Sequence, residues 1–116
     1  MSARSDLLDL LKRLLSLPTA PFHESFVSSF LCDELKRAGL DFHLDNHGNI
    51  LVGDGGEENS VACVAHMDHP GFEIVGVRGD RVEAEWFGGV STNYFVKART
   101  VIYDQVSGAV DRKSVV

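Results

Sequence analysis

A histidine and an aspartate separated by one residue stand in the middle of the chain, in the stretch His66-Met67-Asp68-His69. Along an extended backbone successive side chains point to opposite faces, so His66 and Asp68 are expected on one side and Met67 on the other. A carboxylate placed in this way accepts the hydrogen bond of a metal-ligating imidazole and fixes the orientation of its ring. The pair has two interpretations at this point: a metal ligand with its supporting carboxylate, or two ordinary polar residues at a strand end.

The five residues before the motif, Val61-Ala62-Cys63-Val64-Ala65, are apolar without alternation. Such a run predicts a strand that is covered on both faces, as in the parallel sheets of α/β proteins. Open α/β sheets bind their ligands just beyond the carboxyl ends of the strands, which is where His66 and Asp68 stand. The preceding strand therefore strengthens the interpretation of the pair as a functional site.

Two helices are expected before this strand, because apolar residues repeat there at the spacing of one helix face. Ser5 is the expected N-cap of the first helix, and Pro18 ends that helical stretch. Gly39 is the expected left-handed residue after the second helix. The apolar faces predicted to pack in the core consist of Leu7, Leu8, Leu11, Leu14 and Leu15, and of Phe26, Val27, Phe30, Leu31, Leu35 and Ala38.

The remaining segments predict strands. Alternation with a period of two predicts a strand from residue 40 to residue 45, followed by the turn Asn46–Asn49 and a short strand at residues 50–52. After Gly71, strands are expected over residues 72–77, 81–86 and 94–103, and no helical pattern returns. We therefore predict a boundary near residue 70, with an α/β portion over residues 1–70 and the beginning of an all-β domain over residues 71–116.

The string Val-Ala-Cys-Val-Ala-His66-Met67-Asp68-x-x-Gly71-Phe72 resembles the first metal-binding motif of the tetrahedral, glutamyl-type aminopeptidases. These enzymes are dinuclear metallopeptidases of the zinc exopeptidase group. The resemblance is colinear over nearly the whole chain. It also includes Pro18-Thr19, His23-Glu24 at the start of a helix, Asp45-x-x-Gly48-Asn49-Ile50, and Phe87-Gly88-Gly89-Val90.

The resemblance implies both a fold and an activity. The fold would be α/β: the N-terminal part of a zinc-exopeptidase-like α/β/α catalytic domain, followed by the opening strands of an inserted β-barrel domain. The activity would be removal of N-terminal residues from peptides by two divalent metal ions, zinc or cobalt. His66 would ligate one metal ion, Asp68 would be its neighbouring carboxylate, and the whole enzyme would be a homo-oligomer. The bridging ligand and the general base fall outside these residues, so this N-terminal portion is expected to be inactive alone.

Two positions leave alternatives open. The family usually has a glutamate and a branched aliphatic residue where this chain has His69-Pro70, so the role of His69 is open. The string Asp104-Gln105-Val106-Ser107-Gly108 resembles the bridging-aspartate motif of related aminopeptidases without the barrel insert, which would make Asp104 a second ligand. A hairpin with a polar turn is the favoured alternative for that segment.

Two other classes of protein compete with the aminopeptidase. The stretch from Val64 to His69 is one residue short of the His-x-His-x-Asp-His signature of metallo-β-lactamase-type hydrolases, because Val64 stands where the first histidine would be. The second rival is a non-catalytic interaction module or a degenerate relative that has lost its metals.

Composition excludes several partners. The 116 residues carry 11 Lys and Arg against 17 Asp and Glu, a net charge of −6, which argues against nucleic acid and anionic membrane surfaces. No apolar run approaches the roughly 20 residues that span a bilayer, and no secretory signal is present. Cys32 and Cys63 lie in apolar segments and are expected as buried thiols in a reducing compartment, so a cytoplasmic location is predicted.

Overall fold

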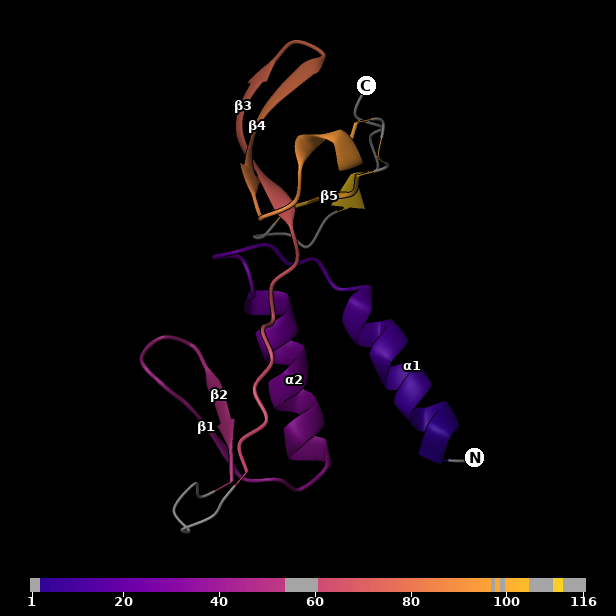
Figure 1. Ribbon diagram of the computed structural model, residues 1–116, viewed down its shortest axis with the longest axis vertical. Coiled ribbons are helices and arrows are strands. Elements are labelled where there is room, and N and C mark those ends of the chain that lie inside the picture. Colours follow the sequence, from indigo (N-terminus) through magenta and orange to yellow (C-terminus); the bar gives the residue numbers. More distant parts are fainter. Residues whose placement is uncertain (1–2, 54–60, 97, 99, 105–109, 112–116) are drawn as a thin grey trace.

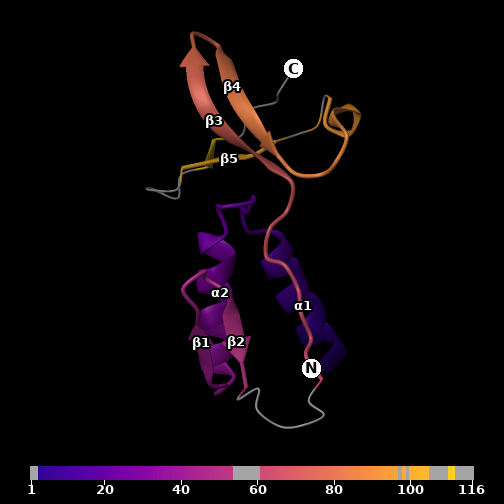
Figure 2. The same cartoon turned by 60° about the vertical axis from the view of Figure 1, so that its left-hand side comes forward.

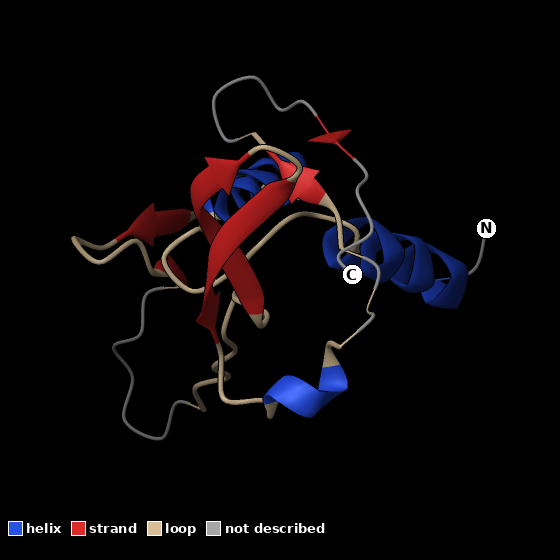
Figure 3. Cartoon of the chain, turned by 90° about the horizontal axis from the view of Figure 1, so that it is seen from above, coloured by secondary structure: helices blue, strands red, loops and turns tan. Residues whose placement is uncertain are grey.

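The computed structural model describes residues 3–53, 61–96, 98, 100–104 and 110–111. Two helices form one end of the molecule and a long β-hairpin forms the other, with the connection between the helices lying between these two parts (Figure 1, Figure 2). Seen from above, the long hairpin lies over the end of the second helix, and the first helix projects to one side (Figure 3). The elements in chain order are α1 (Ala3–Leu15), α2 (Ser25–Arg37), β1 (Phe42–Leu44), β2 (Ile50–Val52), β3 (Gly71–Arg78), β4 (Arg81–Phe87), η1 (Thr92–Tyr94), β5 (Ile102–Tyr103) and β6 (Val110–Asp111).

Both predicted helices form. The sequence correctly predicts the residue that ends α2 but not the residue that begins α1. Helix α1 begins at Ala3, so Ser5 lies inside its first turn and the prediction of Ser5 as the N-cap was wrong. Gly39 after α2 has a φ of 69°, which confirms the predicted left-handed residue. The N–H of Leu40 donates to the carbonyl of Leu35 (3.0 Å), the bond that closes this type of helix end.

Charged and aromatic side chains join the two helices. The guanidinium of Arg13 in α1 lies 2.8 Å from Oε1 of Glu34 in α2 and 4.9 Å from the ring centre of Phe30. A side-chain hydrogen bond from Arg37 and the charge of Arg13 lower the pKa of Glu34 below its ordinary value. The pair is partly exposed, so its contribution to stability is modest.

The leucine face of α1 is largely uncovered. Four of its five leucines have exposed fractions of 45–64%, so the prediction that they pack in a core was wrong for this structure. Leu14 and Leu15 face α2 and residues 65–69 only across a hollow, and the described residues leave the other three leucines largely exposed. The buried apolar residues among the described part are Ala20 in the connection between the helices and Val27 and Cys32 in α2.

The prediction of a buried strand at residues 61–65 was also wrong. Val61 is 90% exposed and Val64 is 93% exposed, and no described strand pairs with this segment. A strand needs a neighbouring backbone to satisfy its N–H and C=O groups, and the described residues supply none here. Cys63 is therefore exposed, and only Cys32 is the buried thiol that the sequence predicts.

The short hairpin β1–β2 forms as predicted, although β1 begins at Phe42 rather than at residue 40. Asp45 organises its turn, because Oδ1 accepts hydrogen bonds from the N–H groups of His47 and Asn49, both at 2.8 Å. Its Oδ2 accepts a third from Nδ2 of Asn49 at 2.7 Å. This carboxylate satisfies backbone N–H groups that the turn at residues 45–49 would otherwise leave to water.

These hydrogen bonds predict an acid-sensitive hairpin. The side chain of Asn49, followed by its backbone N–H, lowers the pKa of Asp45 below its ordinary value of 3.8. Because the folded-state pKa is the lower one, the stabilisation is complete above 3.8 and is lost as the pH falls through the folded value. We expect NMR titration to show Asp45 protonating below pH 3.8, and Asn49→Ala to move that midpoint upward. An unchanged midpoint in Asn49→Ala would contradict this explanation.

The long hairpin β3–β4 has one apolar face and one charged face, and a β-bulge produces this division. The register shifts between Ile74 and Gly76, so Val75 is an extra residue on β3. The shift places Val77 on the same face as Phe72 and Ile74, opposite the apolar partners on β4. The other face carries Glu73, Glu83 and Glu85.

Three aromatic rings pack on the apolar face. The ring centres of Phe72 and Trp86 are 4.7 Å apart, and Phe95 lies 5.0 Å and 4.3 Å from them. Phe95 follows the short helix η1, in which the N–H of Tyr94 donates to the carbonyl of Ser91 at 3.0 Å, and the chain turns again after it, with the N–H of Ala98 donating to the Phe95 carbonyl at 2.9 Å. The predicted strand over residues 94–103 was therefore wrong for its described residues before β5; residues 97 and 99 lie outside the described part.

Strand β5 pairs antiparallel with β6, with Ile102 opposite Asp111 and Tyr103 opposite Val110. This pairing confirms the hairpin interpretation of the segment that follows Asp104; the turn residues 105–109 lie outside the described residues. Within the described part of the chain, no helix is long and apolar enough to cross a membrane.

Candidate functional site

Residues 18–24, which form most of the connection between α1 and α2, contact the His66–Asp68 motif; we call them the linker. The hydroxyl of Thr19 donates a hydrogen bond to the carbonyl of Met67 at 3.0 Å. Ala20 packs under Gly71 so closely that a Cβ added to Gly71 would lie 2.8 Å from the Cβ of Ala20. The linker therefore contacts the chain within the motif, at Met67, and again just after it, at Gly71.

The second half of the linker contacts the long hairpin. The ring of Phe22 meets the ring of Phe87 edge-on with centres 5.9 Å apart, and His23 meets the same ring at 6.3 Å. Nε2 of His23 lies 3.5 Å from a carboxylate oxygen of Glu73 on β3. His23, which the sequence assigns mainly a structural role, thus joins the linker to the charged face of the hairpin.

His66 and Asp68 lie together, as their spacing predicts. Nδ1 of His66 is 2.8 Å from the carbonyl oxygen of Asp68 and 3.2 Å from its Oδ1. Both oxygens can only accept a hydrogen bond, so the hydrogen of a neutral ring must be on Nδ1 and the lone pair on Nε2. The His66 side chain is 79% exposed and that of Asp68 is 38% exposed, so Nε2 is accessible.

The motif also forms one wall of a hollow of about 350 Å³ between the two helices and residues 65–69. Its helical wall is apolar, and His66 and His69 both line it, which brings His69 to the same hollow as the candidate ligand. Its lining residues are Leu14, Leu15, Thr19, Val27, Leu31, Ala65, His66, Met67 and His69.

The donor set fits one ligand of a metal centre. In metal sites a histidine commonly binds the ion through one ring nitrogen and donates the hydrogen on the other to a carboxylate or carbonyl, which is the arrangement of His66 and Asp68. A catalytic zinc ion takes about three protein ligands. Among the described residues no three His, Cys, Asp or Glu side chains come together to hold an ion. His66 can therefore be one ligand of a centre whose other ligands these residues do not supply.

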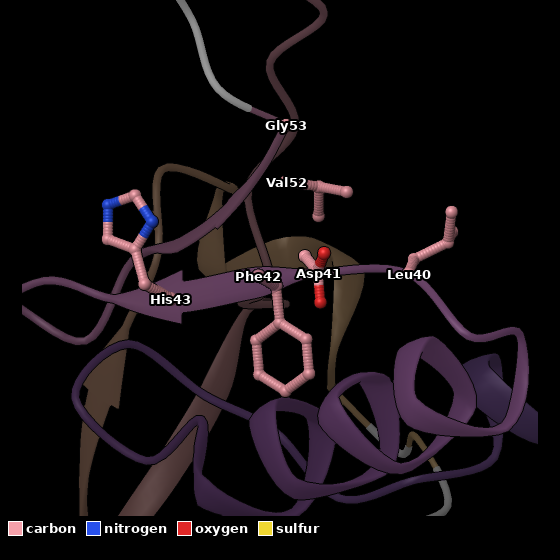
Figure 4. Close-up of a pocket in the computed structure, with 6 residues that line it drawn as sticks. All are labelled: Leu40, Asp41, Phe42, His43, Val52 and Gly53. Atoms are coloured by element: carbon pink, nitrogen blue, oxygen red, sulfur yellow. The ribbon is translucent and has the colours of Figure 1, made fainter.

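A second hollow, of about 430 Å³, lies beside the short hairpin and shares no residue with the first. Phe42 and His43 leave β1 in opposite directions there, and Asp41 stands beside them (Figure 4). The imidazole of His43 comes from β1 and the carboxylate of Asp41 from the residue just before that strand, and no further described metal-binding side chain lines this hollow. With only these two potential ligands, this second hollow is a weaker candidate for a metal site than the motif at His66.

Sequence reasoning missed Thr19 as a member of the site. The resemblance includes Pro18-Thr19, but nothing in the local pattern shows that this hydroxyl reaches a carbonyl 48 residues later. The available signal was a polar residue within the short stretch Pro18-Thr19-Ala20-Pro21.

Comparison with known proteins gives one informative similarity. Over 60 residues the chain is 32% identical to a "[LysW]-lysine hydrolase" of Deinococcus radiodurans. The match covers 52% of this chain and only 17% of the length of that relative. No protein-family model matches the chain, and no solved structure does. The similarity indicates a hydrolase and is consistent with the zinc exopeptidase group; it indicates nothing finer.

Proposed function

We propose that these residues belong to a metal-dependent aminopeptidase, a hydrolase that removes N-terminal residues from peptides. The observation that carries the proposal is the contact of His66 Nδ1 with Asp68, which leaves the lone pair of Nε2 exposed for a metal ion. Similarity to a hydrolase supports the reaction class. In this proposal His66 ligates one of two divalent metal ions, zinc or cobalt, and Asp68 holds its ring.

The chemistry assigns separate tasks to the metal ions and to this chain. Bound divalent metal ions polarise the scissile carbonyl and lower the pKa of a bound water molecule. His66 would ligate one ion through Nε2, and Asp68, by accepting the hydrogen of Nδ1, restrains the orientation of the ring. The general base and the bridging ligand are proposed to lie outside these residues.

The wider organisation is part of the same proposal. Residues 1–70 would belong to a zinc-exopeptidase-like α/β catalytic domain, and residues 71–116 would begin an inserted β domain. The uncovered leucines of α1 and the unpaired segment 61–65 support this division, because both need further protein to cover them. A homo-oligomer in the cytoplasm, acting on peptides, completes the proposal.

The complete gene product tests the proposal. We expect it to release amino acids from aminoacyl-p-nitroanilides when loaded with Zn²⁺ or Co²⁺, to lose this activity with a chelator, and to regain it with metal. We expect the 116-residue chain alone to release none. A complete protein that binds no metal and cleaves no aminoacyl-p-nitroanilide would refute the aminopeptidase. Cleavage of a chromogenic β-lactam instead would favour the metallo-β-lactamase-type alternative.

A further inference from the structure

We infer that Thr19 is a positioning residue for His66, acting from the linker through the Met67 carbonyl. The structure connects the two residues through a continuous path. The hydroxyl of Thr19 donates to the Met67 carbonyl at 3.0 Å, and the next residue, Asp68, accepts the hydrogen of His66 Nδ1 through its own carbonyl at 2.8 Å. The expected effect of Thr19 on metal affinity rests on the proposed function. The expected effect of Thr19 on the orientation and tautomer of the His66 ring does not depend on it.

The Met67 carbonyl matters because it belongs to the peptide group that precedes Asp68. A planar peptide moves as one unit, so a bond to the Met67 oxygen also fixes the N–H and the Cα of Asp68. Both acceptors of His66 Nδ1 are atoms of Asp68. Holding that peptide therefore fixes the Asp68 Cα, from which both acceptor oxygens extend, and so limits the positions that they can take beside Nδ1 of His66.

The linker is suited to hold it. Ala20, directly after Thr19, is only 7% exposed and packs under Gly71, the first residue of β3 and three residues after Asp68. Pro18 and Pro21 fix φ on both sides of these two residues, so the hydroxyl approaches Met67 from a backbone with little freedom. By contrast, the segment 61–65 before the motif is exposed and unpaired, and it cannot hold the motif from that side.

Ring-nitrogen NMR of His66 tests the inference in variants of Thr19. We expect Thr19→Val, which has the same shape without the hydroxyl, to shift the ring from the Nδ1–H form toward a mixture of both tautomers. We expect it to weaken the binding of Zn²⁺, read from the same signals, by about tenfold, since loss of an outer hydrogen-bonding partner costs 10–100-fold. Thr19→Ser keeps the hydroxyl and is expected to keep both properties within about twofold of the native protein.

Thr100→Val is the matched control. The hydroxyl oxygen of Thr100 is buried and has no hydrogen-bond partner among the described residues, so its removal is expected to leave His66 unchanged. If Thr19→Val fails to fold, the smaller Thr19→Ala gives the same comparison. A folded variant without the hydroxyl that keeps the native tautomer of His66 would overturn the inference. If Zn²⁺ does not bind His66 even in the native protein, the proposed function fails, while the tautomer comparison still decides the role of Thr19.

Discussion

Replacing His66 by alanine is expected to remove one metal ion from the complete protein and to abolish its hydrolytic activity. The exposed Nε2 of this ring is the ligand atom in the proposed centre, and alanine offers no replacement. The loss should exceed the roughly 10–100-fold that follows when only an outer partner of a ligand is removed. Metal content by atomic absorption, measured beside turnover of an aminoacyl-p-nitroanilide, gives both quantities on one sample.

Variants of other residues separate ligation from general damage. His43→Ala removes an imidazole from the exposed part of β1, and it should leave metal content and turnover unchanged. Asp68→Ala keeps the backbone carbonyl that accepts from His66 Nδ1 and removes only the carboxylate beside it, so a decrease at the lower end of the 10–100-fold range, about tenfold, is expected. Asp68→Asn should be milder if orientation of the ring matters most. Full metal occupancy and normal turnover in His66→Ala would remove the basis for assigning a metal site to this motif.

The parts of the fold that the sequence predicts are those decided within a few residues. Gly39 ends α2 because only a residue that tolerates a positive φ can close that helix, and Asp45 closes the β1–β2 turn through its own neighbours. The proximity of His66 and Asp68 is local in the same sense, since it follows from the alternation of an extended backbone. In each of these three cases the interacting groups lie within a few residues of one another, so the local sequence contains the cause of the structure.

The failures come from features that depend on distant partners. Apolarity at Val61 and Val64 predicts burial, but burial requires another segment to supply the cover, and no described segment does so. The β-bulge at Val75 follows from the need to keep Val77 on the apolar face, which the strand pairing reveals and the sequence does not. Thr19 is the clearest case, because its partner lies 48 residues away.

The contact between Ala20 and Gly71 predicts a large loss of stability on a small change. Gly71→Ala places a Cβ 2.8 Å from the Cβ of Ala20, which is closer than two carbon atoms can approach without displacement. The Ala20 methyl group is fixed to the backbone and cannot rotate away, so the linker and the motif must separate. We expect a cost of roughly 1–3 kcal/mol in the free energy of unfolding, measured by urea denaturation. Gly89→Ala is the matched control, because a Cβ there meets nothing within 4 Å.

A second substitution shows whether this one contact is the cause. Ala20→Gly deletes the methyl group that the new side chain strikes, at a cost of its own of about 1 kcal/mol from added backbone freedom and lost burial. If the collision explains the loss, Gly71→Ala should cost far less in the Ala20→Gly background than in the native one. The two changes would then be strongly non-additive, as expected for residues in direct contact. Additive costs would mean that Gly71 is needed for another reason. The packing of the linker under the motif would then not be what holds His66 and Asp68 in place.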